Sequence, residues 1–449
     1  MSFSASVHEL VETSEASLVQ AASAWPREPL GNVASILNGF PFKSDHFTNG
    51  AGDPLIRIRD VTSGRTETRY AGPRVDGYWV EPGDLVVGMD GDFNSRIWTA
   101  ERGLLNQRVC KITPDEQVLN LRFLSYLLPG YLQLINEATH SVTVKHLSSK
   151  TLQELPLPVP PLAEQRRIVA KLDALMARTA RARADLDRIP ALATHYKQAA
   201  LAKAFSGELT GSNGMGWREL PISEIADVGT GSTPKRSQAA YYQGGSIPWV
   251  TSSVVNRVYV DSADEFITEQ ALRETNCKIF EPGTLLVAMY GEGQTRGRVS
   301  VLGIAAATNQ ALAAISLASE NIVRRDYLYW FLRSQYLVLR RAAAGGVQPN
   351  LNLGIIKATR VPVPPLEEQV EIVRLVDRAF SEIDRMTTEA VSALRLLDRL
   401  DQAVLAKAFQ GELVLQDPAD EPANILLDRI RAERARTPKA IRGRRTAVA

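Results

Sequence analysis

Two short segments hold the side chains best suited to chemistry, and each directly follows a run of hydrophobic residues. The first runs from Asp90 to Arg96 and reads DGDFNSR, and the second runs from Tyr290 to Arg296 and reads YGEGQTR. The amides of Asn and Gln can pair with the edge of adenine, and the guanidinium group of Arg can pair with guanine or with phosphate. Carboxylates such as Asp90 and Asp92 also suggest a cryptic nuclease or transferase. Tyr290 stands where the first segment has Asp90, which argues against such an enzyme.

The sequence lacks the signatures of several common enzyme classes. It contains no Gly-Lys dipeptide, which excludes the phosphate-binding loop GxxxxGK[ST]. The histidines form no HExxH motif, and His140 and His146 have no Cys or carboxylate at ligand spacing. Gly291 and Gly293 begin a dinucleotide-binding pattern, but Arg296 stands where its last glycine belongs. We therefore expect no catalytic residues, no metal and no cofactor.

Length and composition predict an ordinary multidomain globular protein. At roughly 150 residues per domain, 449 residues predict about three folding units. Because 52 Lys and Arg against 50 Asp and Glu leave a net charge of +2, an anionic partner must be met by local patches. The two cysteines, Cys110 and Cys277, offer neither a disulfide framework nor a CxxC motif, which predicts a cytoplasmic protein. The apolar stretch 299–318 is interrupted by Asn309 and Gln310, so no membrane span is expected.

The strongest pattern in the sequence is an internal repeat. Residues 159–173 (VPPLAEQRRIVAKLD) match residues 363–377 (VPPLEEQVEIVRLVD) at nine of fifteen positions. At the same offset of 204, residues 199–209 (AALAKAFSGEL) match residues 403–413 (AVLAKAFQGEL) at nine of eleven. Weaker matches continue upstream with a drifting offset, including the dipeptide Asn-Gln at 106–107 and 309–310. The repeat predicts two copies of a globular unit followed by a helical unit.

Each helical unit shows the spacing of a coiled coil. In the second copy, apolar residues recur at alternating steps of four and three, at Ile372, Val376, Ala379, Ile383, Met386, Ala390, Ala393, Leu397, Leu400 and Val404. No Gly or Pro interrupts residues 367–410, which would span roughly 66 Å as one helix. In the first copy Pro190 should kink or break the helix. Gly207 and Gly411 are the expected helix stops.

The globular units are predicted to be rich in short strands. The β-prone runs, bounded by Gly, Pro or Asp, are 55–59, 84–89, 109–112, 284–289 and 311–315. Helices are expected at 121–134 and 327–343, so the fold class is α+β. The expected domains are a helical segment 1–23, globular units 24–158 and 213–362, helical regions 159–212 and 363–415, and a basic, disordered tail 416–449.

The doubled arrangement of motifs resembles the specificity subunit of type I restriction-modification systems. The resemblance is carried by PVPPLAEQRRIV and LAKAFSGEL, their copies PVPPLEEQVEIV and LAKAFQGEL, and the EPGD and EPGT turns at 81–84 and 281–284, and it covers about residues 25–413. It implies two target recognition domains, each reading half of a split, asymmetric site on double-stranded DNA. It also implies that the helices form a spacer and dock two methyltransferase subunits, and through them restriction subunits. Methyl transfer and ATP-driven cleavage would belong to those partners.

If the globular units read DNA, the polar and basic residues in and around the two loops are the candidate contacts. The expected DNA contacts in the first unit are Lys43, Arg57, Arg59, Asp92, Asn94, Arg96, Lys145 and His146. Those in the second unit are Lys235, Arg236, Ser252, Ser253, Asn256, Gln294, Arg296, Arg298 and Asn350. Because the loops at 90–96 and 290–296 differ, the two half-sites should differ. Phe205 and Phe409 are expected to dock the methyltransferase, although they could simply seal the coiled coil.

The repeat favours an antiparallel helix pair with pseudo-twofold symmetry, in which helix length sets the gap between the half-sites. The alternative is a noncatalytic coiled-coil adaptor whose globular ends bind proteins. Steep loss of duplex binding with added salt would favour DNA recognition, and a flat salt response would favour the adaptor.

Overall fold

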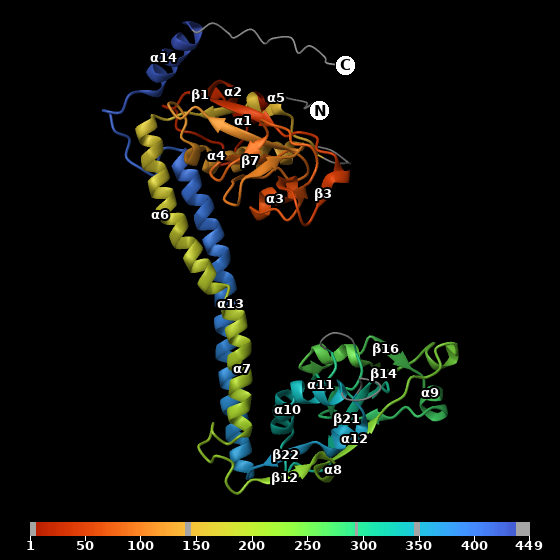
Figure 1. The fold of residues 1–449 in the computed structure, drawn as a ribbon. Coiled ribbons are helices and arrows are strands. Elements are labelled where there is room, and N and C mark those ends of the chain that lie inside the picture. The colour runs from red at the N-terminus through yellow and green to blue at the C-terminus, as the bar shows by residue number, and fades with distance from the viewer. Residues whose placement is uncertain (1–5, 140–144, 292–294, 345–350, 437–449) are drawn as a thin grey trace. The chain divides into compact units, whose positions relative to one another are not determined.

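The computed structural model describes residues 6–139, 145–291, 295–344 and 351–436 of the chain. The chain divides into two compact units. Unit 1 combines Met1–Asp185 with Ala393–Ala449, and unit 2 is Leu186–Ser392. Each unit contains one strand-rich domain and one stretch of paired helices (Figure 1). The expected α+β class is confirmed.

The strand-rich domain of unit 1, called the first β domain, runs from β1 to β11. Its central antiparallel sheet has the order β2-β10-β7-β8, with strands Ala34–Asn38, Val109–Pro114, Leu85–Gly88 and Ser95–Ile97. A second sheet has the order β3-β5-β4-β9-β6, with strands Phe47–Thr48, Arg69–Tyr70, Asp53–Ile56, Gly103–Leu105 and Trp79–Val80. β1 (Arg27–Pro29) pairs with β11 (Pro156–Pro158). β7 lies between β10 and β8 and is buried at all four positions. A strand buried on both faces needs an unbroken apolar run, and such a run predicted the strand here.

The helices of the first β domain are short except for α4 (Leu121–Ala138), which confirms the expected helix at 121–134. Asn120 begins α4 by accepting a hydrogen bond from the backbone N of Phe123, and Phe123, Leu127 and Tyr131 face the core. The remaining helices of unit 1 outside the coiled pair are α1 (Val7–Glu12), α2 (Leu30–Val33), α3 (Ile58–Ser63), α5 (Ser149–Gln153), the 3-10 turn η1 (Ser44–His46) and α14 (Ala423–Arg436).

The expected strand at 55–59 is wrong in its second half. Strand β4 ends at Ile56, and α3 begins at Ile58. The Asp60 carboxylate accepts a hydrogen bond from the backbone N of Arg57 at 2.8 Å, which caps the first turn of a helix. Gly64 ends that helix with a φ of 72°. The β-prone run 55–59 predicted a strand over its whole length. That pattern could not show that Asp60 would cap a helix at Arg57.

Unit 2 contains the second β domain, from β12 to β22. One sheet has the order β13-β21-β18-β19-β15, with strands Ala226–Thr230, Leu312–Leu317, Leu285–Ala288, Val299–Leu302 and Tyr259–Val260. Another has the order β16-β14-β20-β17, with strands Glu265–Ile267, Ile247–Val250, Ala306–Thr308 and Ile279–Phe280. β12 (Arg218–Pro221) pairs with β22 (Arg360–Val363). The short helices are α8 (Ile222–Ile225), η2 (Ala239–Tyr241), η3 (Ser252–Asn256), α9 (Glu269–Glu274) and α12 (Leu353–Ala358).

The helix expected at 327–343 is divided. α10 (Arg325–Ser334) and α11 (Tyr336–Ala344) meet at Gln335, which closes the last turn of α10. Tyr327, Leu328 and Leu332 on α10 fill the core of unit 2.

Three long helices, α6 (Leu162–Leu186), α7 (Ile189–Phe205) and α13 (Leu366–Phe409), form the paired stretches. α6 pairs with one part of α13 in unit 1, and α7 pairs with another part of α13 in unit 2. α6 and α7 are separated by two residues, and Pro190 lies in the first turn of α7, so the expected break at this proline is confirmed. α13 is continuous over 44 residues. α7 and α13 each end two residues before a glycine in the left-handed region, Gly207 with φ 78° and Gly411 with φ 76°, as expected.

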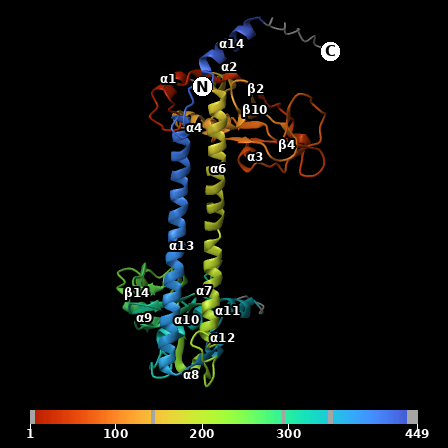
Figure 2. The same ribbon diagram turned by 90° about the vertical axis from the view of Figure 1, so that its left-hand side faces the viewer.

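The pairing is antiparallel within each unit. In unit 1, Arg183 near the end of α6 lies 2.7 Å from Asp398 and 3.1 Å from Asp401 of α13, while the start of α6 packs in one core with Phe409. α6 and α13 lie side by side in both ribbon views (Figures 1 and 2). In unit 2, Lys197 of α7 pairs with Asp384 of α13. The pseudo-twofold symmetry stays a prediction.

The expected apolar seam of α13 is wrong at two positions. Ile372 and Val376 are fully buried, but Met386 is 56% exposed and Leu400 is 49% exposed. Phe380 is buried and was not in the predicted seam. An α-helix has 3.6 residues per turn, so a strict step of 3.5 drifts around its surface unless the helices supercoil. The buried face of α13 therefore includes Phe380 and leaves Met386 and Leu400 in contact with solvent.

The repeated PPLxEQ motif forms the junction between β domain and helix in each unit. In unit 1 the Gln165 amide donates to the carbonyls of Val118 at 2.8 Å and Pro160 at 2.9 Å, and its oxygen accepts from the backbone N of Asn120 at 2.8 Å. In unit 2 the Gln369 amide makes the same three bonds, to Ile322 O, Pro364 O and Arg324 N, at 2.9, 2.9 and 2.8 Å. These fully satisfied buried amides fix each domain to the start of its helix.

The glutamate of the same motif occupies equivalent positions in the two units, but its pKa is shifted in opposite directions. Glu164 accepts from the indole N of Trp25 at 3.3 Å, and Glu368 accepts from that of Trp217 at 3.1 Å. Burial raises the pKa of Glu164. Burial also acts to raise the pKa of Glu368, but hydrogen bonds from Ser212, Thr210 and Trp217 outweigh it and the pKa is lowered.

The expectation of a disordered tail from residue 416 is wrong for part of that segment. α14 (Ala423–Arg436) packs Leu426, Leu427 and Ile430 into the core of unit 1. Arg431 of α14 pairs with the buried Glu28. The basic composition masked an apolar stripe with helical spacing, which is sufficient to bury a short helix. Residues 437–449 lie outside the described residues.

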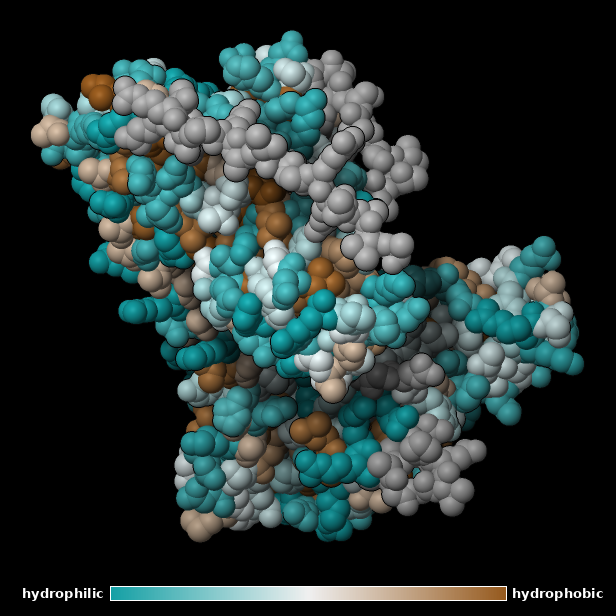
Figure 3. All heavy atoms as spheres, turned by 45° about the horizontal axis from the view of Figure 1, so that its top comes forward, coloured by the Kyte–Doolittle hydropathy of each residue, from teal (hydrophilic) through white to brown (hydrophobic). Residues whose placement is uncertain are grey.

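The surface and the cysteines complete the description. On the face drawn in Figure 3, hydrophilic residues predominate and hydrophobic ones are scattered. Of the helices that the structure describes, none is long and apolar enough to cross a membrane. Within the same residues, no group of three or more His, Cys, Asp or Glu could hold a metal ion. Cys110 and Cys277 are free and buried, and burial raises the pKa of the Cys110 thiol to about 12.

Candidate nucleic-acid interface

The structure joins two of the sequence segments expected to contact DNA in unit 1. The loop after β7 lies beside the segment that precedes α5, because the backbone N of Gly91 donates to Lys145 O at 2.9 Å and that of Leu147 donates to Met89 O at 2.7 Å. The side chains meet as well, since Asp90 Oδ1 lies 2.5 Å from His146 Nδ1. The candidate residues Asp92, Asn94, Lys145 and His146, which span 54 positions of sequence, therefore belong to one surface region.

Arg108 completes this region, although the sequence did not single it out. Its Nε lies 3.3 Å from Asp90 Oδ2, and one of its Nη atoms lies 3.2 Å from His146 Nδ1. Its φ of 71° is unusual for a residue with a side chain. The repeated Asn106-Gln107 dipeptide directly before it was the available signal, but the repeat did not show where the next side chain would point.

Asp92 and Asn94 are organised by short contacts of their own loop. Asn94 Nδ2 donates to the carbonyl of Asp92 at 2.7 Å, and Asp92 Oδ1 lies 3.5 Å from Asn136 Nδ2. Lys145 Nζ donates to the carbonyl of Asn136 at 2.6 Å, so its ammonium group is held at the end of α4. This arrangement presents an amide and a cation from a fixed backbone, which suits base and phosphate contacts respectively.

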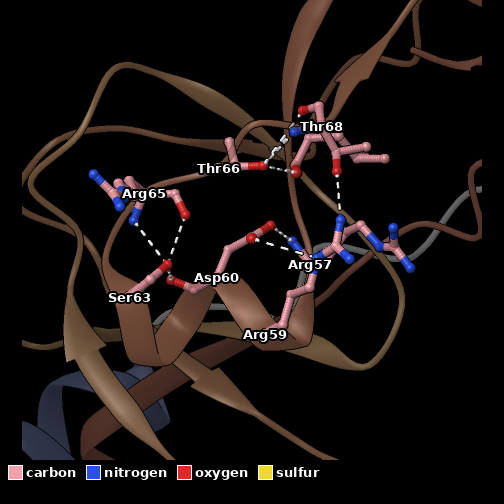
Figure 4. A network of polar contacts seen from close by, with 8 residues as sticks. Arg57, Arg59, Asp60, Ser63, Arg65, Thr66 and Thr68 are labelled. Carbon is pink, nitrogen blue, oxygen red and sulfur yellow. Dashed lines mark hydrogen bonds and ion pairs between the residues drawn. The ribbon is translucent and has the colours of Figure 1, made fainter. Parts of the chain in front are cut away.

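Arg96 lies beside the end of α3, whereas Arg57 and Arg59 lie at the start of that helix. Arg96 is exposed on β8, and a Cβ on Gly64 would lie only 2.5 Å from its Nη1, so the glycine at the end of α3 makes room for the guanidinium group. Arg59 donates to Thr68 Oγ1 at 3.0 Å. Figure 4 shows Asp60 turned back toward the backbone of Arg57, with Arg59 reaching toward Thr68. Lys43 is exposed just before η1.

In unit 2 the structure brings together four of the expected residues. Ser252, Ser253 and Asn256 form η3, and Arg298, which directly precedes β19, donates to Asn256 Oδ1 at 2.6 Å. The neighbouring Arg296 has a buried Nε with no partner among the described residues. Gln294 and Asn350 lie outside the described residues. The contact of Leu351 N with Met289 O at 3.2 Å is the counterpart of Leu147 N with Met89 O, so both domains join these two segments in the same way.

Lys235 and Arg236 are expected contacts that belong to another part of the second β domain. Lys235 is exposed. The guanidinium of Arg236 lies 4.9 Å from the ring centroid of Tyr242 and 5.0 Å from that of Trp249, and it forms a bidentate pair with Glu265. Hydrogen bonding to Arg236 lowers the pKa of Glu265. Arg236 therefore already has an anionic partner, and a phosphate would have to compete with it.

A cleft of about 500 Å³ in the first β domain contains further charged residues that the sequence did not single out. Arg69 lies 2.8 Å from Glu101, and Arg74 lies 3.7 Å from Asp53. Arg102, the third arginine of the cleft, lies 2.8 Å from Glu81. Because all three arginines have an acidic partner, this cleft has no strong preference for an anion.

The structure places the two candidate docking phenylalanines inside their units. Phe409 is 1% exposed and packs edge-on against Phe123, with ring centroids 6.0 Å apart. Phe205 is partly buried and packs edge-on against Tyr327 at 5.3 Å and Phe331 at 5.5 Å. A direct contact of Phe409 with a partner protein would require the ring to leave this core, and such docking stays a prediction.

Comparison with known proteins agrees with this architecture. The family described as the type I restriction modification DNA specificity domain matches residues 23–190 and 215–392, once in each repeat. The chain is 38% identical to the type I restriction enzyme EcoBI specificity subunit of Escherichia coli, over 97% of this chain and 98% of that protein. It is 25% identical to the EcoKI specificity subunit of E. coli strain K12, over 92% of this chain and 96% of that one.

Solved structures share the fold. A chain from a type I restriction-modification complex, 21% identical in sequence, superposes with a TM-score of 0.66 over 88% of this chain and 100% of that one. The HsdS subunit from Thermoanaerobacter tengcongensis, also 21% identical, superposes with a TM-score of 0.57 over 88% of this chain and 98% of that one. With both repeats matched by one family and a relative aligned nearly end to end, the chain belongs to the type I restriction-modification specificity proteins.

Proposed function

We propose that this protein is the sequence-specific DNA-recognition subunit of a type I restriction-modification complex. It reads a bipartite, asymmetric site on double-stranded DNA and carries no catalytic residues of its own. It works in the cytoplasm and docks two methyltransferase subunits and, through them, the restriction subunits. The observation that carries the proposal is the family match in both repeats, one match per β domain.

The composition of the candidate surfaces supports two different half-sites. The segment 90–96 offers Asp92, Asn94 and Arg96, whereas the segment 290–296 has Glu292, Gln294 and Arg296 at the same positions of the sequence. Asn and Gln differ by one methylene, so their amides reach a base edge from different backbone distances. Arginines and lysines around each loop supply phosphate contacts that give affinity without sequence choice.

The test is to map methylated adenines across the genome of the source cell with and without this gene. Loss of one split motif, with all other methylation unchanged, is the expected result. Methylation that is unchanged by loss of the gene would overturn the proposal. Complementation with the intact gene should restore the same motif and no other.

A binding experiment separates DNA recognition from the protein-adaptor alternative. Affinity for a duplex containing the mapped motif should fall steeply as salt is raised, because phosphate contacts release counterions. Affinity for that duplex should exceed affinity for a scrambled one by about three orders of magnitude or more. A flat salt response, or equal affinity for both duplexes, would instead support the adaptor.

A further inference from the structure

Unit 2 contains a cleft of about 1050 Å³ between α7 and the second β domain. α10 lies against α7 at this place (Figure 1). The side chains that line the cleft include five cations, Lys197, Arg257, Arg298, Arg333 and Arg340, and no carboxylate. A concave surface with that imbalance attracts an anionic ligand.

Aromatic rings hold two of the cations in place. The Arg333 guanidinium lies 4.7 Å from the Trp330 centroid and 5.5 Å from the Phe380 centroid, and that of Arg340 lies 5.4 Å from the Tyr336 centroid. Among the described residues, neither arginine forms an ion pair, whereas Lys197 pairs with Asp384. Arg333 and Arg340 are therefore the positions at which an incoming carboxylate gains most.

The cleft also has apolar walls. Leu201 and Phe205 of α7 line one side, and Val258, which is 50% exposed, lines the other. A sugar-phosphate backbone cannot use such surface, whereas an amphipathic peptide can place apolar side chains on it and acidic ones toward the arginines. The mixture favours an acidic amphipathic segment over nucleic acid.

The corresponding surface of unit 1 is already covered by a peptide of this kind. The repeat offset of 204 holds across these helices, since Tyr126 bonds Asp173 just as Trp330 bonds Asp377. Ser334 in the cleft therefore corresponds to Gly130 of α4, and a Cβ on Gly130 would lie 2.8 Å from the Cβ of Leu18.

The other wall of the cleft has a covered counterpart as well. Phe205 and Ser206 correspond to Phe409 and Gln410 at the same offset. In unit 1 the backbone N of Ala22 donates to Phe409 O at 3.3 Å, and the Gln410 amide donates to Gln20 Oε1 at 3.2 Å. The N-terminal segment thus contacts both walls in unit 1.

The covering segment is acidic and amphipathic. Residues 6–22 read SVHELVETSEASLVQAA, with three glutamates and no Lys or Arg, and Val7, Val11 and Val19 are buried. Unit 2 has no equivalent, because only residues 206–217 separate α7 from β12. Gly214 lies against Gly207 as Ala22 lies against Gly411. The residues before Gly214 lead directly back to the end of α7, so no segment comparable to residues 6–21 precedes Gly214.

We propose that the cleft of unit 2 binds an acidic amphipathic segment of a partner protein. This segment occupies the position that residues 6–22 occupy in unit 1. The cleft shares Asn256 and Arg298 with the candidate DNA contacts of unit 2, so duplex binding is measured separately on each variant.

The experiment uses the full-length chain and a fluorescent peptide with the sequence of residues 6–22 as the probe. Val258→Glu should weaken peptide binding about tenfold or more, whereas Val258→Lys should leave it equal or stronger. Val258 is half exposed, so neither change should disturb folding, and thermal melting checks this. Arg340→Glu should also weaken binding. Arg385→Glu, on the exposed face of α13 and outside the cleft, is the matched control and should have no effect.

Three results would overturn the proposal. The first is equal peptide affinity for the two Val258 variants. The second is displacement of the peptide by an unlabelled DNA duplex in proportion to duplex binding, which would make the cleft a nucleic-acid surface. The third is a concentration-dependent dimer that Val258→Glu abolishes, which would identify a second copy of this chain as the occupant. Duplex binding measured separately on each variant shows whether DNA recognition has failed instead.

Discussion

Asp90 is the residue at which the candidate DNA-contacting segments of unit 1 converge. Its two carboxylate oxygens lie within 2.5 Å of His146 Nδ1 and 3.3 Å of Arg108 Nε. An acidic residue beside a DNA surface is unfavourable for phosphate binding by simple Coulomb repulsion. Its contacts suit a different role, which is to position the side chains of His146 and Arg108.

We predict that Asp90→Asn weakens binding of the specific duplex by about tenfold or more, because a charge-assisted hydrogen bond is worth roughly 1.5–3 kcal/mol. Binding of a scrambled duplex should stay equal or become stronger, because a negative charge has been removed. Duplex titrations at one salt concentration measure both. Asp45→Asn, at an exposed position in η1, is the control for charge alone. A parallel gain for both duplexes would show that Asp90 acts only through its charge.

The two junction glutamates give a second prediction at the residue scale. The folded-state pKa of Glu164 is raised. Its favourable contribution to the free energy of unfolding is therefore present at low pH and is lost as pH rises through that pKa. At neutral pH, Glu164→Gln should therefore raise the free energy of unfolding of unit 1 by about 1 kcal/mol, while keeping an acceptor for the Trp25 indole.

Glu368 should behave in the opposite way. Its pKa is lowered, so its contribution is present above the ordinary glutamate value and is lost as pH falls through the lowered pKa. Glu368→Gln should lower stability at neutral pH by about 1–2 kcal/mol, and the loss should shrink under acid conditions. Hydrogen exchange of each unit in both variants, at neutral and at acid pH, measures these changes. Equal effects of the two substitutions on stability would contradict the opposite pKa shifts of Glu164 and Glu368.

At the scale of elements, α7 and α13 each end in a phenylalanine, and these two rings pack against α10 and α4 respectively. Phe409 is almost fully enclosed, whereas Phe205 has one side on the cleft of unit 2. The same sequence motif therefore meets two different environments.

We predict that Phe409→Ala destabilises unit 1 by about 3–5 kcal/mol, because the large side chain leaves a buried cavity. Phe205→Ala should destabilise unit 2 by less, because the cleft already exposes part of its ring. Hydrogen exchange in α4 and in α10 gives the two values separately. If Phe409→Ala left exchange in α4 unchanged but abolished methyltransferase binding, the ring would be a docking contact rather than a core residue.

At the scale of the whole molecule, we expect the length of the continuous α13 to set the spacing of the proposed bipartite site. Seven residues of helix correspond to about 10 Å, and this is close to three base pairs of B-DNA at roughly 3.4 Å each. We predict that deleting one heptad from α13 together with one from α7 changes the number of unread base pairs between the half-sites while leaving both half-sites intact.

Methylation mapping of this double deletion measures the gap directly. Deleting a heptad from α13 alone is the control, and it should abolish recognition because the ion pair of Lys197 with Asp384 would lose its register. An unchanged gap in the double deletion would show that the helices do not set the spacing.

Much of the fold could be predicted from the sequence because its signals are local. The run Leu85–Gly88, the capped start of α4 and the break before Pro190 each depend on a few neighbouring residues. The seam of α13 could not be predicted at Met386 and Leu400, because it depends on how the partner helix winds. α14 was missed because its apolar stripe is short and lies in a basic segment.

The sequence by itself determined the duplication and the two globular units with their helices, because two long motifs recur at one offset, and the resemblance of those motifs pointed to the family. It also pointed to the loop at 90–96 and to the segment at 145–146. Only the tertiary structure decided that these two meet through Asp90 and Arg108, that Arg236 already has a partner in Glu265, and that Phe409 is enclosed. The reason is physical: the types and spacing of residues specify local conformation, whereas burial and charge pairing arise between residues that are distant in sequence and are set when the chain packs.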